Sequence, residues 1–198
     1  GRGVTDSGVP RRRPDQRGTG GRRSGGRARP ARAAKVLVIR TGGAPLSIVD
    51  GVRGFAAAQP GVAAVVDGDR VQTYGELDER SSRVATALLA AGLAPGDAVA
   101  VLLGNRLEYC EIAAGIAKAG LVMVPLNPRM TGPEVDYIVG HSGARGLVLD
   151  DALAGIADGV APGLHSVLSI GGTSLGPSYD EALASARAVD PRIAIDEN

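Results

Sequence analysis

Residues 98–128, AVAVLLGNRLEYCEIAAGIAKAGLVMVPLNP, decide the fold of this chain because they read in turn as a strand, a helix and a strand. Residues 98–103 are a nearly continuous apolar run, which is typical of a parallel strand covered on both faces. Residues 121–124 form a second run of this kind. Two parallel strands joined by a helix need a right-handed crossover. The stretch therefore predicts an α/β fold, a layered and mostly parallel sheet flanked by helices.

The residues that flank the helix predict its boundaries. Asn105 is expected to cap the first turn while the Glu108 side chain reaches back toward it, as in a capping box. Gly120 is expected to end the helix after about residue 119, since glycine tolerates the left-handed conformation found at helix C-termini. Pro125 and Pro128 are expected to end the second strand, since proline cannot donate to a ladder.

Similar signals predict helices and strands through the rest of residues 46–198. The capping-box spacing, in which glutamate follows serine or threonine by three residues, opens predicted helices at Thr73, Thr131 and Ser178. Asp67-Gly68 supplies a turn with positive φ, which favours a short β-hairpin. The predicted elements are a helix at 46–58, strands at 62–66 and 70–73, helices at 73–91 and at 131 up to Gly143, a strand at 146–149, a short helix or turn at 150–157, a strand at 165–170 and a helix at 178–188.

The composition limits the class of protein. A chain of 198 residues can hold one domain with a hydrophobic core, and an aromatic content of 3% makes that core aliphatic. The single cysteine, Cys110, excludes an internal disulfide and fits a reducing compartment, so a cytoplasmic protein is expected. Cys110 itself is interpreted as a buried small hydrophobe on the central helix. No apolar run approaches the roughly 20 residues needed to cross a bilayer, so no membrane span is predicted.

The first part of the chain is strongly basic. Residues 1–34 hold ten arginines and two aspartates among glycine, proline and serine, whereas the remaining residues are net acidic. Such a segment cannot bury enough apolar surface to offset its ordering entropy, so residues 1–45 are predicted to be a disordered leader and residues 46–198 the folded domain. Arginine clusters can serve as a tail for nucleic acid or an anionic surface. The absence of interleaved aromatics favours an incidental leader, with a true start near Lys35 or Leu46, and makes nucleic-acid binding an unfavoured hypothesis.

Two segments come near to a catalytic motif and fail in a specific way. Residues 171–176, GGTSLG, have the glycine spacing of a phosphate-binding loop, but Pro177 stands where the lysine should be, so a surface loop is the better interpretation. Residues 140–144, GHSGA, approach a nucleophile elbow around Ser142. An elbow needs a strand before the serine and a helix after it, and here the predicted order is reversed. His141 is interpreted as a polar residue in the last turn of a helix.

Metal and thiol chemistry find no support in the spacing. The two histidines lie 24 positions apart, and with one cysteine they form no recognised ligand pattern. The pairs Asp67/Asp69 and Asp150/Asp151 are interpreted as turn and capping residues rather than a cation site. A catalytic role for Cys110 is disfavoured because neither histidine is near it in sequence. Periodicity and spacing thus predict a fold class and no active site: catalytic, cofactor-binding and metal residues are all predicted to be absent.

Four segments taken together resemble the adenylate-forming, or AMP-binding, enzyme superfamily, and within it the acyl-CoA synthetases. In order and spacing they cover about residues 46–149. They are residues 72–85, QTYGELDERSSRVA; residues 92–97 and 99–105, GLAPGD and VAVLLGN; residues 118–131, KAGLVMVPLNPRMT; and residues 137–145, YIVGHSGAR. The Asn-Pro-Arg sequence at 127–129 is more similar to acyl-CoA ligases than to amino-acid-activating domains.

The resemblance implies a two-step ligase that uses ATP, Mg²⁺ and coenzyme A. A carboxylate such as a fatty acid would form an acyl-adenylate, and a thiol would then displace AMP. The phosphate loop of that family, and its later motifs, would follow Asn198, so the chain resembles an N-terminal fragment that is inactive alone and binds none of these cofactors tightly. No catalytic or nucleotide-binding residue of the family can be transferred to a position in this chain.

Two questions stay open at the level of sequence. Asn127, Pro128 and Arg129 follow a predicted parallel strand, where α/β folds place ligand-facing loops, although a scaffold role is the simpler interpretation. The competing hypothesis for the whole chain is a non-catalytic α/β module, or a remnant of an enzyme, with a basic tail. A third hypothesis for the whole chain, beside the ligase fragment and the non-catalytic module, is a hydrolase that uses Ser142.

Overall fold

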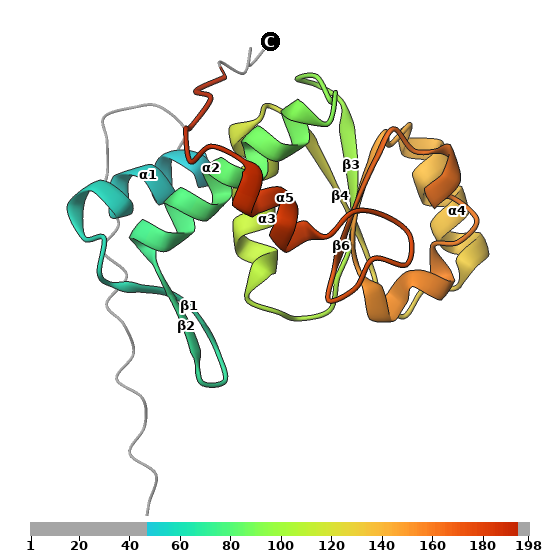
Figure 1. Cartoon of the computed structure of the whole chain (residues 1–198), viewed down its shortest axis with the longest axis horizontal. Coiled ribbons are helices and arrows are strands. Elements are labelled where there is room, and N and C mark those ends of the chain that lie inside the picture. Colours follow the sequence, from blue (N-terminus) through green and yellow to red (C-terminus); the bar gives the residue numbers. More distant parts are fainter. Residues whose placement is uncertain (1–46, 194–198) are drawn as a thin grey trace, which may run out of the picture. The chain divides into compact units, whose positions relative to one another are not determined.

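The computed structural model describes residues 47–193, which form one compact unit (Figure 1). The predicted leader, residues 1–45, lies outside the described residues. Within 47–193 no helix is long and apolar enough to cross a membrane.

A parallel four-stranded sheet is the centre of this unit, as the sequence predicts. Its strands are β3 (Ala98–Leu102), β4 (Val122–Leu126), β5 (Gly146–Asp150) and β6 (Ser166–Ile170), in the spatial order β4-β3-β5-β6. All three neighbouring pairs are parallel. Strand β3 therefore lies inside the sheet, which explains why its sequence is apolar on both faces.

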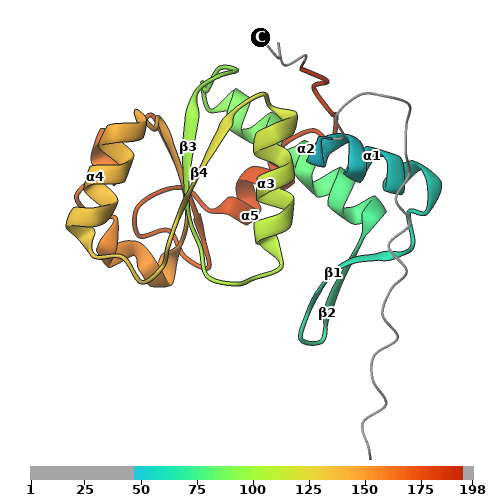
Figure 2. The same ribbon diagram turned by 180° about the vertical axis from the view of Figure 1, so that it is seen from behind.

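Helices cover both faces of the sheet, and alternate residues of β3 point into two separate cores (Figures 1 and 2). Val99 and Val101 pack toward α2 (Tyr74–Ala90), α3 (Glu108–Lys118) and α5 (Tyr179–Ser185). Ala100 and Leu102 pack toward α4 (Gly132–Ser142) and the residues around two short 3₁₀ helices, Asp151–Ile156 and Ala161–Gly163. The prediction of an α/β layer structure is confirmed.

A helix and a hairpin precede the sheet. Helix α1 (Ile48–Ala58) packs on α2 and α3, and β1 (Ala63–Asp67) pairs antiparallel with β2 (Arg70–Thr73). Gly68 in the hairpin turn has φ of +59°, as the Asp-Gly pair predicts. The hairpin forms a two-stranded sheet of its own.

The capping boxes of two helices are confirmed. At α2, Thr73 Oγ1 accepts from the Glu76 backbone N–H at 3.3 Å while the Glu76 carboxylate accepts from the Thr73 backbone N–H at 2.8 Å. At α4, the Glu134 carboxylate accepts from the Thr131 backbone N–H at the same distance. These hydrogen bonds lower the pKa of both glutamates, the backbone one most.

The predicted start of α3 is wrong. The helix begins at Glu108 rather than just after Asn105, and its N-cap residue, Leu107, has no side-chain cap hydrogen bond. The Glu108 side chain does not reach back to Asn105 but contacts Arg70 and Arg106. The hairpin supplies an acceptor instead, because the Asp67 carboxylate accepts from the Leu107 N–H at 3.3 Å. Tertiary contacts thus replace the local cap.

Two other boundaries differ from the prediction. Strand β4 continues through Pro125, which pairs in register with Val101. The strand lies at the edge of the sheet, where a residue without an N–H is tolerated, so the proline does not end it. Helix α5 ends at Ser185, earlier than the predicted residue 188.

Candidate functional site

The carboxyl edge of the parallel sheet is where this fold class places ligands. Four loops meet this edge, after β3, β4, β5 and β6. Two of them are joined by an ion pair, since Arg106 after β3 contacts Asp150 at the end of β5 with 2.7 Å between Nη1 and Oδ2. This ion pair fixes the loop after β3 to the end of β5.

Glu108 extends this ion pair into a chain of charges. Arg106 Nε donates to Glu108 at 2.9 Å, and Arg70 on the hairpin donates to the other carboxylate oxygen of Glu108. Burial alone would raise the pKa of Glu108, but the hydrogen bonds from Arg106 and Arg70 outweigh it and lower that pKa to about 2. The series Arg70, Glu108, Arg106 and Asp150 ties the hairpin to α3 and to the sheet edge.

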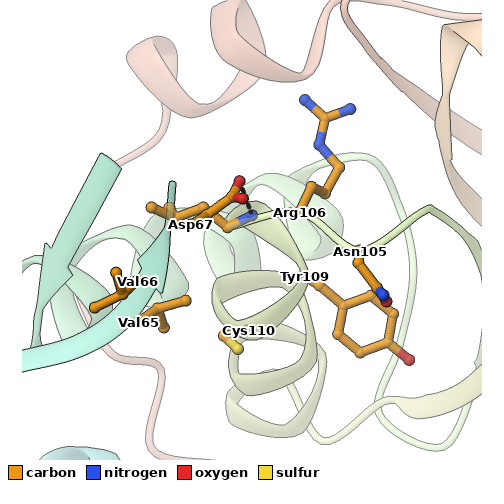
Figure 3. A pocket seen from close by; sticks show the side chains of 8 residues that line it. Val65, Val66, Asp67, Asn105, Arg106, Tyr109 and Cys110 are labelled. Carbon is orange, nitrogen blue, oxygen red and sulfur yellow. Dashed lines mark hydrogen bonds between the residues drawn. The ribbon is translucent and has the colours of Figure 1, made fainter. Parts of the chain in front are cut away.

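A cavity of about 310 Å³ lies between β1 and the first turn of α3 (Figure 3). Its size is at the lower end of the range for small-molecule sites, about 300 to 1,000 Å³. Asp67 spans it toward the backbone of Leu107, and Cys110 lies on the wall that α3 contributes. The lining residues are Val65, Val66, Asp67, Asn105, Arg106, Leu107, Tyr109 and Cys110. They include no histidine and only one carboxylate, so the lining offers no acid–base pair of carboxylates and no nucleophile–histidine pair.

A buried carboxylate lies behind the hairpin, between the helices. Glu111 on α3 is fully buried and accepts two hydrogen bonds from Arg80 on α2, at 2.6 and 2.7 Å. Gln72 Nε2 on β2 donates a third at 2.5 Å, and Tyr179 Oη on α5 donates a fourth at 2.6 Å. Gln72 Oε1 has no hydrogen-bond partner among the described residues. Four elements distant in sequence therefore meet at one carboxylate.

The electrostatics of this cluster keep Arg80 charged and Tyr179 protonated. Hydrogen bonds from Arg80 to Glu111 raise the pKa of the guanidinium further above its usual range. Desolvation, followed by the charge of Glu111, raises the pKa of the Tyr179 hydroxyl well above its ordinary value. The tyrosine thus stays a neutral donor. Because every charge is paired inside the protein, the cluster is suited to hold α2, α3, β2 and α5 together rather than to exchange protons with a substrate.

A second buried charge joins α3 to α2. The ammonium of Lys118 is fully buried and donates to the backbone oxygen of Asp78 at 2.8 Å, to the Asp78 carboxylate at 2.7 Å and to Ser82 Oγ at 2.9 Å. All three of its protons have acceptors. The two helices also approach closely at Gly115, where an added Cβ would lie 2.5 Å from the Val84 Cβ. This helix pair is a rigid support for the sheet.

Ser142 and His141 lie at the C-terminal end of α4, and strand β5 follows them in the chain. The order is helix and then strand, which is the reverse of a nucleophile elbow. The Ser142 hydroxyl donates to the Val139 carbonyl at 3.2 Å, and His141 is exposed and stacks on Tyr137. The prediction that His141 lies in the last turn of a helix is confirmed.

Asp150 has the capping role predicted for it, whereas Asp151 and Asp67 bind groups distant in sequence. Asp150 accepts from the Ala152 N–H at 3.1 Å at the start of a 3₁₀ helix. Asp151 accepts from the Ser169 hydroxyl and from both the backbone and the hydroxyl of Ser174, each at 2.9 Å. The Ser174 backbone contributes most to lowering the pKa of Asp151. Within residues 47–193, no group of three or more His, Cys, Asp or Glu side chains could hold a metal ion.

The glycine-rich loop at 171–176 is packed against the protein by its own glycines. A side chain at Gly172 would collide with the Asp151 carboxylate, and a Cβ at Gly176 would lie 2.7 Å from the Val167 carbonyl oxygen. These glycines permit close approach to internal partners. The loop is therefore a surface loop closed onto Asp151, which agrees with the sequence interpretation.

Cys110 is exposed, so its interpretation as a buried hydrophobe is wrong. It lies on the hairpin side of α3, beside the cavity. Partial desolvation, with a smaller effect from the charge of Glu111, raises the pKa of its thiol. A raised pKa reduces the thiolate population, which is the opposite of what a catalytic cysteine needs.

Asn127, Pro128 and Arg129 are exposed at the end of β4. The Asn127 side-chain oxygen accepts from the Arg129 N–H at 2.9 Å, which makes a local turn. These residues thus lie at the carboxyl edge of the sheet, and within residues 47–193 Arg129 forms no ion pair.

Sequence reasoning missed the residues that form the charge clusters, namely Arg106, Glu111, Arg80 and Lys118. The sequence contains one signal for two of them, Glu111 and Lys118. Glu111 and Lys118 are seven residues apart on the predicted helix, so they share one face with Gly115 between them. A face that combines charges with a small residue is typical of a close helix contact that buries paired charges.

A model of the family described as "AMP-binding enzyme" matches residues 52–192, most of the described residues. The chain belongs to the AMP-binding enzyme family. Among curated relatives, a fatty acid–[acyl-carrier-protein] ligase, ScoC, of Streptomyces coeruleorubidus is 39% identical over 137 residues, which is 69% of this chain and 26% of the relative. A long-chain-fatty-acid–CoA ligase, FadD13, of Mycobacterium tuberculosis is 32% identical over 144 residues, 72% of this chain and 29% of the relative.

Solved structures of the AMP-binding family share this fold. A Mycobacterium tuberculosis fatty acyl CoA synthetase superposes with a TM-score of 0.67 and 32% identity, over 74% of this chain and 30% of that one. The N-terminal domain of FACL13 from the same organism has a TM-score of 0.70 and 30% identity, over 78% of this chain and 40% of that one. The chain thus spans less than a third of the length of the two curated relatives, and it matches an N-terminal domain.

Proposed function

We propose that this chain is the N-terminal part of an ATP-dependent acyl-CoA synthetase, which converts a carboxylate to an acyl-adenylate and then to a thioester. The observation that carries the proposal is the family match across residues 52–192, together with relatives that are named as fatty-acid ligases. The two named acceptors, coenzyme A and an acyl-carrier protein, differ in kind, and we favour coenzyme A. A cytoplasmic location belongs to the same proposal.

The glycine-rich loop at 171–176 does not fit the phosphates of ATP, and no described group of side chains is suited to a magnesium ion. The space that a phosphate would need beside Gly172 and Gly176 is filled by Asp151 and Val167, and residues 47–193 hold no cluster of metal ligands. The charged groups at the sheet edge, Arg106 and Glu108, are paired with each other. We therefore propose that the sites for ATP, Mg²⁺ and coenzyme A lie outside residues 47–193, and that this region serves as their scaffold.

The proposal is tested by carboxylate-dependent exchange of pyrophosphate into ATP. A polypeptide that extends this chain to the length of its relatives is expected to catalyse exchange with fatty acids and to form a thioester when coenzyme A is added. The chain of 198 residues by itself is expected to show no exchange. A panel that covers short, long and aromatic carboxylates identifies the substrate class.

The outcomes separate the alternatives. Exchange by the extended polypeptide that needs no carboxylate, or no exchange at all, would contradict the ligase assignment and favour the non-catalytic module. Exchange by the chain of 198 residues alone would show that the ATP site has been misplaced. Transfer to an acyl-carrier protein but not to coenzyme A would correct the acceptor.

A further inference from the structure

The last described segment of the chain, residues 186–193, crosses the helices in an irregular conformation and is called the strap here (Figure 1). It follows α5 and is fixed to α2 by two hydrogen bonds. Arg83 Nη1 donates to the Ala186 carbonyl at 2.8 Å, and Thr86 Oγ1 donates to the Val189 carbonyl at 3.2 Å. The strap thus passes over α2 toward α1.

The strap reaches α1 through a two-point ion pair. Arg53 Nε and Nη2 lie 2.6 and 2.7 Å from the two carboxylate oxygens of Asp190. The Arg53 and Asp190 side chains are only 24% and 14% exposed. Parallel hydrogen bonds between a guanidinium and a carboxylate are among the strongest in proteins. The hydrogen bonds from Arg53 outweigh burial and lower the pKa of Asp190 to about 2.

The backbone of the strap is shaped around the same carboxylate. The Arg192 N–H donates to Asp190 Oδ1 at 2.9 Å, and Arg192 has φ of +49°, the one positive value at a non-glycine residue within residues 47–193. A non-glycine residue in this region is strained and persists only when its surroundings hold it. The buried ammonium of Lys118 on α3 lies 4.0 Å from Asp190 Oδ2. Asp190 is therefore the point at which the strap is attached.

The remaining attachment of α1 is small. Only Val49 and Val52 are buried on this helix of 11 residues, and the apolar cluster around Val52 is the smallest of the three in the described region. Phe55 adds a stacking contact with Tyr74, with 4.7 Å between ring centroids. Within residues 47–193, the bonds from Arg53 to Asp190 are the only side-chain hydrogen bonds that join α1 to another element.

We propose that α1 and the strap form a latch in which each holds the other in place. The strap is the route by which the chain leaves the described unit, and it has little regular structure of its own. A displacement of the chain beyond Ile193 would break the contact at Asp190 and release α1 from α2 and α3. The two segments, whose contacting residues Arg53 and Asp190 are 137 positions apart in sequence, then open and close together, whether or not the proposed ligase activity is correct.

The test uses the full-length polypeptide. It measures the opening of one segment in a variant that carries a substitution in the other segment. Asp190→Asn alters the strap, and hydrogen exchange of amides in α1 is expected to become about tenfold faster, the effect of losing a charged hydrogen bond. Arg53→Met alters α1 and keeps its apolar stem, and tryptic cleavage after the exposed Arg187 of the strap is expected to accelerate by a similar factor. Arg145→Met removes an ion pair with Asp97 elsewhere and should change neither.

A double variant, Arg53→Met with Asp190→Asn, is the second measurement. Because one pair of side chains fastens both segments, the double variant is expected to speed exchange in α1 and cleavage of the strap no more than the single variants do. The proposal is overturned if each single variant loosens only its own segment, if the Arg145→Met control loosens both, or if the effects of the two single variants add in the double variant. Faster exchange in β3 and β5 in the single variants, without such addition in the double variant, would still support the latch.

Discussion

Replacing Glu111 by glutamine should lower the free energy of unfolding by about 3 to 5 kcal/mol, because it leaves buried donors around a site that no longer carries a charge. Glu111 accepts four hydrogen bonds, and each bond to a charged group contributes about 1.5 to 3 kcal/mol. Arg80 is 38% exposed and can turn toward water, so its two bonds contribute least to the loss. Gln72 and Tyr179 are buried and donate to different oxygens of the carboxylate. A glutamine has one side-chain oxygen, so it can replace only one of these two acceptors.

The assay is urea denaturation followed by far-ultraviolet circular dichroism, since the chain contains no tryptophan. With a urea m-value of about 2 kcal/mol per M, a loss of about 4 kcal/mol lowers the midpoint by about 2 M. The matched control is Glu79→Gln, which removes an exposed pair with Arg83 one turn away on α2 and should cost less than about 0.5 kcal/mol. A Glu111→Gln variant within about 1 kcal/mol of the natural protein would refute the claim that this cluster holds the helices together.

Three further predictions concern pH, packing and reactivity. Glu108 and Asp190 have folded pKa values of about 2, below their ordinary 4.5 and 3.8, so the stability that they contribute is complete above about pH 4.5 and is lost as the pH falls toward 2. Urea midpoints across that range should show the decline, and Asp190→Asn should reduce its slope; an unchanged slope would contradict the assignment. Gly115→Ala should destabilise by about 1 to 3 kcal/mol through overpacking, whereas Gly54→Ala, with open space in α1, should stabilise by about 0.5 to 1 kcal/mol in thermal melts; equal effects would show that the helix contact is not tight. Cys110 should react with a thiol reagent in the folded protein, more slowly than free cysteine at neutral pH and faster as the pH rises; reaction only after unfolding would show that it is buried.

Local patterns in the sequence determined most of the fold. The continuous apolar run at 98–103 predicts a strand buried on both faces, and β3 is that strand, in the interior of the sheet. Capping boxes predict where α2 and α4 begin, and the structure confirms both at Thr73 and Thr131. Four motifs in register also indicated the family, which the match across residues 52–192 confirms. These features depend on neighbouring residues, so the sequence alone is enough to find them.

The tertiary structure decided what depends on distant residues. Pro125 stays in a strand because β4 lies at the sheet edge, and strand order is not written in any local pattern. Helix α3 has no local cap because Arg70, on the hairpin, binds the Glu108 carboxylate, and Asp67, also on the hairpin, accepts from the Leu107 N–H instead. Glu111 finds donors on three other elements, from 31 to 68 positions away. The periodicity of a sequence reports which face of an element is apolar, whereas the partner of a buried charge depends on which faces meet, and only the folded chain settles that.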